Sequence, residues 1–444
     1  MLKKIDLINY FIEGCKSSDN LKIGTEHEKF IYHKHNFEVI PYRGDVSITS
    51  VLEHFNTYDW KSVYEDENVI ALTKDKASIT LEPGGQFELS GAPLTTVHET
   101  CIEINNHLKI TKELEDKFDI GFLGIGFYPI NKLDKIDTVP KKRYSQIMVP
   151  YMTEIGGLGL EMMHQSATVQ ANFDFTSEKD MQKKVNASSV LQPLITGLFA
   201  NSPFKDSNLS GYESYRNNVW FHTDQDRSGI PEFLIQDTLS FEEYVDFALK
   251  IPVYSIIRDN EYLNCTQYSF EDLMNNKNPE INPEDLILDD WINHVSTIFT
   301  EVRLKSFIEM RGADAGGYKS LCALPALWTG ILYSEDSLNE TLSITNKFKY
   351  EDILNFRKDV CQIGLNAEIN GQEGWALARE ILEISKRGLK HRQKINAFGD
   401  DENIHLSYLE ELIDLKKSNA ALMVEKYYME NNMNTELLFG EQSF

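Results

Sequence analysis

Two glutamates lie two positions apart in a short segment that alternates between polar and apolar residues. They are Glu26 and Glu28, within Gly-Thr-Glu-His-Glu-Lys-Phe at positions 24–30. In an extended strand, side chains two residues apart point to the same face, about 7 Å from each other. Such carboxylates repel one another, and a divalent cation beside them would offset the repulsion. A solvated edge strand would carry the same pattern, so the pair alone does not separate the two interpretations.

A second acidic segment surrounds a Pro-Gly-Gly turn at positions 83–85. The turn places Glu82 at the end of one strand and puts Gln86 and Glu88 on one face of the next. Phe87 and Leu89 alternate with them and favour burial of the opposite face. We expect the two polar residues to face the other side of the sheet, although a surface hairpin with incidental acids has a similar sequence.

A third segment carries polar residues at every second position. It places Thr168, Gln170, Asn172 and Asp174 on one side of a predicted strand. Amide and carboxylate oxygens in such a row can bind a hard cation or hydrogen-bond a polar substrate. A strand with a solvated polar face would look similar.

A fourth segment, positions 302–314, is expected to be one strand with charges of both signs on a single face. Opposite charges two residues apart suit a site that holds both a metal and an anion, such as a triphosphate or a carboxylate bound by arginine. A surface ladder of ion pairs is the alternative. The predicted face carries Arg303, Lys305, Phe307, Glu309 and Arg311.

Two arginines lie in the loop-rich stretch between the third and fourth segments. Arg216 and Arg227 have aromatic residues and turn formers as neighbours, rather than the charges of a solvated helix. This composition is compatible with recognition of phosphate or carboxylate groups.

Electrostatics limits what these segments can do if their acids converge in one cleft. Two like charges 4 Å apart cost about 4 kcal/mol at an effective dielectric constant near 20. Several such pairs would exceed the roughly 5–15 kcal/mol that stabilises a typical domain. Either the acids do not converge, or cations hold them; all-oxygen ligands favour Mg²⁺ or Mn²⁺ over zinc. Convergence predicts a nucleotide site with two or three metal ions, built from Glu26, Glu28, Glu82, Glu88 and Glu309.

Helices are expected to support these strands. Residues Thr96 to Leu114 form an amphipathic pattern with a capping box, and Cys101 lies on its apolar stripe as a core thiol. The last third is mostly helical, with segments Ala376 to Leu389 and Tyr408 to Met429. We predict one catalytic domain over residues 1–444, with a sheet-forming core at about 20–335 and a helical part at about 346–444.

Composition excludes several classes of function. Acidic residues outnumber basic ones by 69 to 44, giving a net charge of −25 that repels nucleic acids and anionic membranes. The five cysteines form no C-x-x-C pair, and no signal peptide or membrane-spanning run is evident, which predicts a cytoplasmic protein. The zinc-protease, phosphate-loop and hydrolase-elbow motifs are absent from the sequence.

Taken together, the segments resemble the glutamate–cysteine ligases of the plant and proteobacterial type. The Pro-Gly-Gly hairpin and the EMRGAD strand are the most specific, and the matches cover roughly residues 20 to 335 in the family's order. The matching stretches are GTEHEKF, LEPGGQFELSG, ATVQANFDF, LFANSPF, SYRNNVW, TDQDRSG, EVRLKSFIEMRGAD and LCALPALW.

The resemblance implies an α+β fold related to glutamine synthetase and guanidino kinases, in which a curved, mainly antiparallel sheet forms the active-site cleft and helices lie outside. It implies that the γ-carboxylate of glutamate attacks the γ-phosphate of Mg-ATP, and that the amine of cysteine attacks the resulting acyl phosphate. This reaction is the first step of glutathione biosynthesis. The small-molecule partners would be glutamate, cysteine and ATP, with the protein a monomer or weak homodimer.

The resemblance also implies roles for individual residues. Arg311 and Glu309 would act in catalysis, and Arg311, Arg216, Arg227 and Asn172 would bind substrate or nucleotide. Plant members use disulfides for redox control, and Cys322 lies in a matching segment; because the sequence gives it no partner, we predict no redox switch. The implied metal ligands are Glu26, Glu28, Glu82, Glu88, Gln170 and Glu309.

Three other functions remain open from the residues. A ligase of the same fold could use a different amine. A phosphotransferase would share the metal-and-arginine chemistry but need no second nucleophile. An acidic binding protein would neither turn over ATP nor be stabilised by metal.

Overall fold

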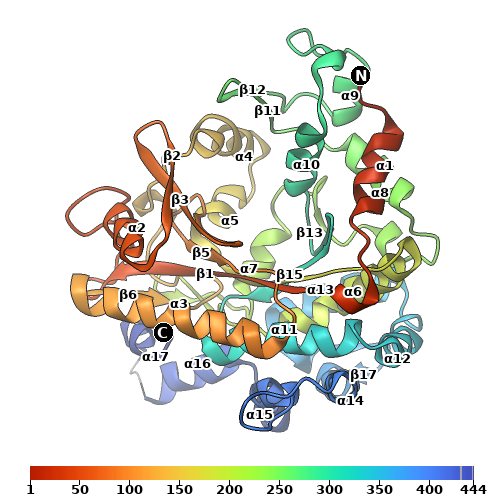
Figure 1. The fold of residues 1–444 in the computed structure, drawn as a ribbon. Coiled ribbons are helices and arrows are strands. Elements are labelled where there is room, and N and C mark those ends of the chain that lie inside the picture. Colours follow the sequence, from red (N-terminus) through yellow and green to blue (C-terminus); the bar gives the residue numbers. More distant parts are fainter. Residues whose placement is uncertain (431–432, 443) are drawn as a thin grey trace.

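The protein is built around one large antiparallel sheet in the computed structural model, which describes residues 1–430, 433–442 and 444 (Figure 1). The strands follow the order β14-β15-β7-β1-β5-β4-β3-β2, and β6 pairs with the second half of β1. These strands are β1 (Ile23–His33), β2 (Lys61–Glu65), β3 (Asn68–Lys74), β4 (Ala77–Leu81), β5 (Phe87–Ser90), β6 (Ile120–Leu123), β7 (Thr168–Phe173), β14 (Val302–Leu304) and β15 (Ile308–Asp314).

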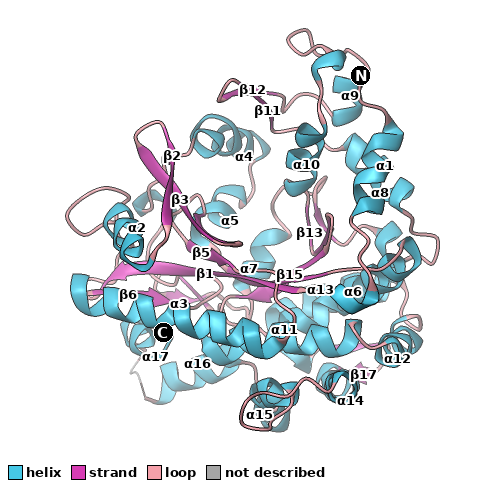
Figure 2. Cartoon of the chain, in the orientation of Figure 1, coloured by secondary structure: helices cyan, strands magenta, loops and turns pink. Residues whose placement is uncertain are grey.

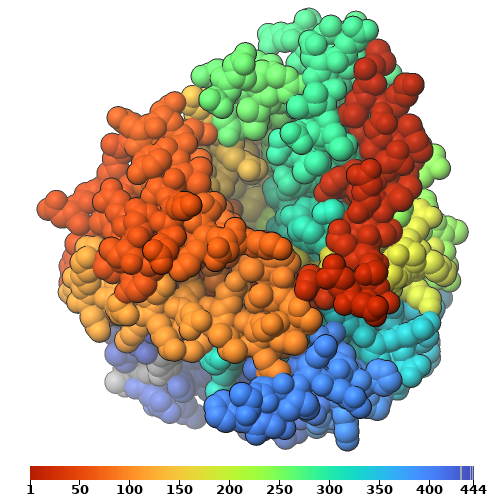
Figure 3. Space-filling model, viewed as in Figure 1, coloured from red at the N-terminus to blue at the C-terminus, as the bar shows by residue number. Residues whose placement is uncertain are grey.

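Helices cover one face of the sheet and leave the other face to line a hollow. Figure 2 shows α3 and α11 beneath the sheet, and α6 packs against β15 on the same side. Figure 3 shows the hollow between the N-terminal strands and the segments near residues 150 and 290. The supporting helices are α3 (Val97–Phe118), α6 (Glu178–Leu198), α11 (Tyr318–Leu332), α12 (Glu335–Thr345), α13 (Tyr350–Ile363) and α14 (Gly374–Arg392).

Shorter elements form the sides of the hollow and the two ends of the chain. Among the described residues, no helix is both long and apolar enough to span a bilayer. The helices are α1 (Lys4–Glu13), α2 (Ile48–Phe55), α4 (Val149–Ile155), α5 (Gly159–Gln165), α7 (Tyr215–Trp220), α8 (Phe241–Lys250), α9 (Phe270–Met274), α10 (Leu288–Ser296), α15 (Ser407–Leu415), α16 (Asn419–Met429) and α17 (Leu438–Gln442). The short strands are β8 (Phe204–Lys205), β9 (Asn208–Leu209), β10 (Ser228–Gly229), β11 (Ser255–Arg258), β12 (Glu261–Asn264), β13 (Phe299–Thr300), β16 (Glu368–Ile369) and β17 (Gln372–Glu373).

Local sequence explains the elements that support the site. Helix α3 begins at the predicted capping box, where the Thr96 hydroxyl accepts from the Glu99 backbone N–H. Between β4 and β5, Gly85 adopts φ +84°, a left-handed conformation that favours glycine. A Cβ at this position would meet only the movable end of the Ile48 side chain, so the left-handed backbone is the reason for glycine here. The predicted α+β class, with a mainly antiparallel sheet, is confirmed.

The fourth segment differs from its prediction. Residues 302–314 form a hairpin, β14 and β15, instead of one strand, and Arg303 lies directly opposite Glu309. The chain reverses at residues 305–307, where the Lys305 backbone N–H donates to the Phe307 carbonyl at 2.7 Å. The charges continue to alternate through this turn, so the sequence pattern does not reveal that the chain reverses here.

The predicted C-terminal segment from Tyr408 to Met429 is also divided. It forms α15 and α16, with Lys416 between them at φ +50° in the left-handed region. Ser418 then caps α16 by accepting from the Ala421 backbone N–H. Helical periodicity spans such a break without revealing it, because the apolar positions resume in phase.

Candidate active site

The polar residues of four predicted segments meet on the open face of the sheet. Strand pairing sets Glu28 opposite Glu88 and Glu26 opposite Gln170. Asn172 lies opposite Glu309 on the next strand pair, and its Nδ2 donates to Glu26 Oε1 at 2.7 Å. Directly paired residues share a face, so all these side chains project into the same cleft.

Hydrogen bonds fix the orientation of the carboxylates. The Glu28 carboxylate accepts from the Thr168 backbone N–H at 3.0 Å. The Glu88 carboxylate accepts from the hydroxyls of Thr80 at 3.2 Å and Ser90 at 2.5 Å. These contacts hold acidic oxygens toward the cleft before any ligand arrives.

Burial, followed by mutual repulsion, sets the electrostatics of the acidic cluster formed by Glu26, Glu28, Glu82 and Glu88. Burial, followed by the charges of Glu309 and Glu88, raises the pKa of Glu26 to about 7. Burial and then the charge of Glu82 raise the pKa of Glu28 well above its ordinary value and also raise the pKa of Glu88. At neutral pH Glu26, Glu28 and Glu88 therefore need nearby cations if all three are to be ionised.

The donor set fits Mg²⁺ or Mn²⁺. Glu26, Glu28, Glu82 and Glu88 offer hard oxygen ligands, as the predicted site requires. The amide oxygen of Asn172 is buried and has no hydrogen-bond partner, which is a further oxygen that a ligand can use. No thiol or imidazole is needed to complete such a set.

Glu309 lies in a different environment from the other acids. Its fully buried carboxylate forms ion pairs with Arg303, with Arg311 at 3.2 Å and with Lys305 at 3.4 Å. These cations overcome burial and hold the pKa of Glu309 well below its usual range. Its proposed metal role stays a prediction, while the structure shows a carboxylate already neutralised by protein cations.

Arg311 and Arg216 lie beside this acidic cluster. The Arg311 guanidinium donates to Gln170 Oε1 at 2.5 Å, which links it to the same face. Arg216 is buried and donates from Nη2 to the Arg311 carbonyl at 3.2 Å. Its Nε and Nη1 atoms have no hydrogen-bond partner, so two donors remain for an anion.

Arg216 and Arg311 belong to a group of basic side chains, called the basic corner below, that two further residues complete. Trp220 and Arg357 join Arg216 and Arg311 around a cavity of about 10 Å³. Trp220 Nε1 and Arg357 Nη2 are buried donors without partners. Trp220 belongs to the SYRNNVW stretch that resembles the family, whereas Arg357 lies on α13, in the part expected to be only structural.

Arg227 differs from its prediction. Its side chain is fully buried and donates to Asp224 at 2.7 Å and to the Pro252 carbonyl at 2.8 Å. Its guanidinium also stacks 4.1 Å from the Tyr254 ring centroid. Because these partners occupy it, Arg227 supports the wall of the hollow and does not offer its charge to a substrate.

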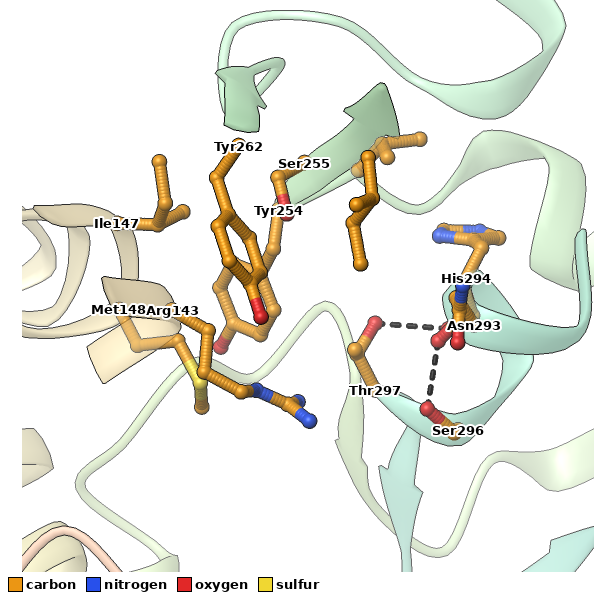
Figure 4. Close-up of a pocket in the computed structure, with 12 residues that line it drawn as sticks. Arg143, Ile147, Met148, Tyr254, Ser255, Tyr262, Asn293, His294, Ser296 and Thr297 are labelled. Atoms are coloured by element: carbon orange, nitrogen blue, oxygen red, sulfur yellow. Dashed lines mark hydrogen bonds between the residues drawn. The ribbon is translucent and has the colours of Figure 1, made fainter. Parts of the chain in front are cut away.

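The cavity at the Glu26 end of the sheet is much larger than the pocket beside Tyr254. A cavity of about 650 Å³ opens at the Glu26 end of the sheet and is lined by Lys16, Lys22, Lys76 and Asn172 as well. The pocket in Figure 4, beside Tyr254 and Tyr262, measures only about 50 Å³. That pocket is too small for a nucleotide, whereas the cavity beside Glu26 has room for one.

Comparison with known families identifies the chain. The model of glutamate–cysteine ligase family 2 matches residues 22–438. The chain belongs to this family. It is an ATP-dependent ligase that forms γ-glutamylcysteine, the first step of glutathione synthesis.

Relatives of the ligase are found in plants. The chain is 46% identical to chloroplastic glutamate–cysteine ligase A of Oryza sativa subsp. indica, covering 88% of this chain and 79% of that protein. It is 43% identical to the chloroplastic enzyme of Medicago truncatula, covering 99% of this chain and 85% of the relative. It is 41% identical to the Arabidopsis thaliana enzyme, with coverages of 99% and 83%.

The names of these relatives contradict the predicted cytoplasmic location, because the relatives are chloroplastic. The prediction rested on scattered cysteines without a C-x-x-C pair and on a sequence with no evident signal peptide or membrane-spanning run. Both are compatible with any reducing compartment and do not distinguish one from another.

Solved structures share the fold at low sequence identity. Glutamate–cysteine ligase from Francisella tularensis, solved in complex with AMP, is 11% identical with a TM-score of 0.57, covering 96% of this chain and 87% of that chain. A bifunctional glutathione synthetase from Pasteurella multocida is 12% identical with a TM-score of 0.51, covering 100% of this chain and 53% of that chain. These likenesses show a shared fold.

Proposed function

We propose that the ligase activates glutamate as an acyl phosphate on the open face of the sheet. A γ-carboxylate oxygen of glutamate attacks the γ-phosphorus of ATP, and ADP leaves. The amine of cysteine then attacks the acyl carbon, the amide bond forms, and phosphate leaves with the carboxylate oxygen. The arrangement of carboxylates beside unpaired arginine donors carries this proposal, because phosphoryl transfer depends on positioning and charge neutralisation.

Two or three Mg²⁺ ions, or Mn²⁺ ions, are the proposed cofactors. When bound, they neutralise charge on the ATP oxygens and on the transferring phosphoryl group. The raised pKa values of Glu26, Glu28 and Glu88 support this assignment, since nearby cations would offset the burial and the mutual repulsion that raise them. The proposed ligands are Glu26, Glu28, Glu82, Glu88, Gln170 and Glu309.

The basic corner would hold an anionic oxygen of a substrate. Arg216, Trp220 and Arg357 direct unpaired donors at a cavity with room for about one water-sized group. A carboxylate oxygen of glutamate or a phosphoryl oxygen matches both the space and the charge. Arg311 lies between this corner and Gln170, where it can contact the transferring group.

The larger cavity is the proposed entrance for ATP. Lys16, Lys22 and Lys76 line it together with Glu26, so cations surround the route to the metal-binding face. A triphosphate would otherwise meet the strong repulsion of a chain with net charge −25. A relation of the whole fold to glutamine synthetase and guanidino kinases is part of the same proposal, supported by a polar, cleft-forming antiparallel sheet.

ADP release from Mg-ATP by purified protein tests the function. Rapid release that requires both glutamate and cysteine is expected of the ligase. Release with glutamate alone that cysteine does not accelerate would favour the phosphotransferase or another amine. No release under any condition would contradict an ATP-dependent reaction.

A further inference from the structure

A second cluster of possible ligands lies behind the sheet, away from the carboxylates. Cys101 on α3, Cys322 on α11 and His405 on the 3₁₀ segment Glu402–Leu406 each direct one ligand atom to a common point. These three atoms lie within 4.8 Å of one another. No partner for Cys322 was predictable from the sequence, because the two residues beside it in the cluster are 221 and 83 positions away along the chain.

Hydrogen bonds around His405 determine which of its nitrogens is free. His98 Nε2 lies 3.3 Å from the Lys394 carbonyl, which only accepts, so Nε2 carries the proton and neutral His98 accepts at Nδ1. His405 Nε2 lies 3.0 Å from that Nδ1 and must therefore donate. His405 Nδ1 is left with a lone pair, directed at Cys101 Sγ 3.4 Å away.

We propose that Cys101, Cys322 and His405 form a binding site for Zn²⁺. Two thiolates and one imidazole nitrogen, with the second imidazole nitrogen hydrogen-bonded to a neighbour, are a ligand set that zinc prefers. Zinc–sulfur and zinc–nitrogen bonds of about 2.3 and 2.1 Å require ligand atoms somewhat under 4 Å apart, so only a small contraction of the cluster is needed. Binding releases two protons, one from each thiol, to the solvent.

The position of the cluster indicates a structural site. Both cysteines are buried, and the three ligands come from separate elements that pack together beneath the sheet. A bound ion would connect α3 to α11 and to the segment before α15. A disulfide between the two cysteines would use the same sulfurs but would leave the His405 lone pair without a ligand, which is why the geometry favours a metal.

The test uses the reduced, metal-free full-length chain with excess Mg²⁺ to occupy the carboxylates. Cobalt(II), a spectroscopic substitute for zinc, is titrated while thiolate-to-cobalt absorption is recorded in the near ultraviolet. We expect saturation at one equivalent, displacement by Zn²⁺, and a higher unfolding temperature with Zn²⁺. The sulfur-specific absorption separates this site from the active-site acids.

Two variants and a matched control test which side chains bind the metal ion. Cys322→Ser is expected to abolish the thiolate band, and His405→Phe to weaken cobalt binding at least tenfold while the thiols remain. Cys361→Ser, at a buried cysteine on α13 outside the cluster, should bind like the unmodified chain. Far-ultraviolet circular dichroism tests whether each variant is folded. If Cys322→Ser does not fold, Cys101→Ser takes its place in the experiment.

Absence of a stoichiometric thiolate band in the reduced protein would overturn the proposal. Unchanged cobalt affinity in His405→Phe would equally exclude the three-residue site. Metal binding that persists after the two cysteines are oxidised to a disulfide would place the ion elsewhere.

Discussion

Replacing Glu26 by glutamine separates the effect of the acidic cluster on the stability of the fold from its effect on ligase activity. Burial and the charges of Glu309 and Glu88 raise the Glu26 pKa from 4.5 to about 7. The folded protein then binds more protons than the unfolded chain between these two pH values, so its stability falls as pH rises through this window. At about 1.4 kcal/mol per pH unit, the loss reaches at most about 3.5 kcal/mol above pH 7.

Glu26→Gln removes this ionisation. In the absence of divalent metal at pH 8, we expect the variant to be more stable than the parent by up to about 3.5 kcal/mol. At pH 4.5 the two proteins should differ little, because Glu26 is then almost fully protonated in the folded protein and only half ionised in the unfolded chain. The same variant should lose most ligase activity, since one proposed anionic ligand is gone.

Urea unfolding at several pH values, with and without Mg²⁺, measures the effect. Mg²⁺ should stabilise the parent more than the variant at pH 8. Glu13→Gln, at an exposed position on α1, is the matched control and should change neither quantity. A variant that is less stable than the parent at pH 8 without metal would refute the reasoning about repulsion.

Three further substitutions test other parts of the site. Glu309→Gln leaves Arg303 without its buried partner, so we expect a loss of about 3–5 kcal/mol in urea unfolding even without Mg²⁺, together with loss of activity; unchanged stability would contradict the ion-pair description. Arg357→Gln should raise the KM for glutamate or ATP at least tenfold in steady-state kinetics, and it should also lower stability in urea unfolding, because the buried Glu301 carboxylate loses its ion-pair partner. Arg227→Met should instead lower stability by a few kcal/mol and leave both KM values nearly unchanged, whereas a selective KM effect would return Arg227 to the substrate site.

Alternation along the chain was sufficient to predict which residues share a face. Glu26 and Glu28, or Gln170 and Asn172, are two positions apart, and strand geometry alone directs each pair to one side. The pairing of Glu28 with Glu88 depends on the register between β1 and β5, and this register could not be predicted from the sequence. The resemblance to a family brought these segments together before the structure gave their register.

Contacts between distant positions were not predictable in the same way. Arg357 reaches the basic corner from α13, where its neighbours in sequence form an ordinary helix with no local signal of binding. The ion pairs of Glu309 depend on a turn at residues 305–307 that charge alternation concealed. Likewise, Arg227 has the residue type of a phosphate ligand, and only its buried partners show that it is a structural residue.

Transfer of oxygen from substrate to phosphate tests the central claim most directly. Glutamate labelled with ¹⁸O in both γ-carboxylate oxygens is incubated with Mg-ATP, cysteine and the enzyme, and the released phosphate is analysed by mass spectrometry. Activation as γ-glutamyl phosphate predicts one ¹⁸O atom in phosphate for each γ-glutamylcysteine formed. Unlabelled phosphate at full product yield would contradict an acyl phosphate intermediate on this face of the sheet.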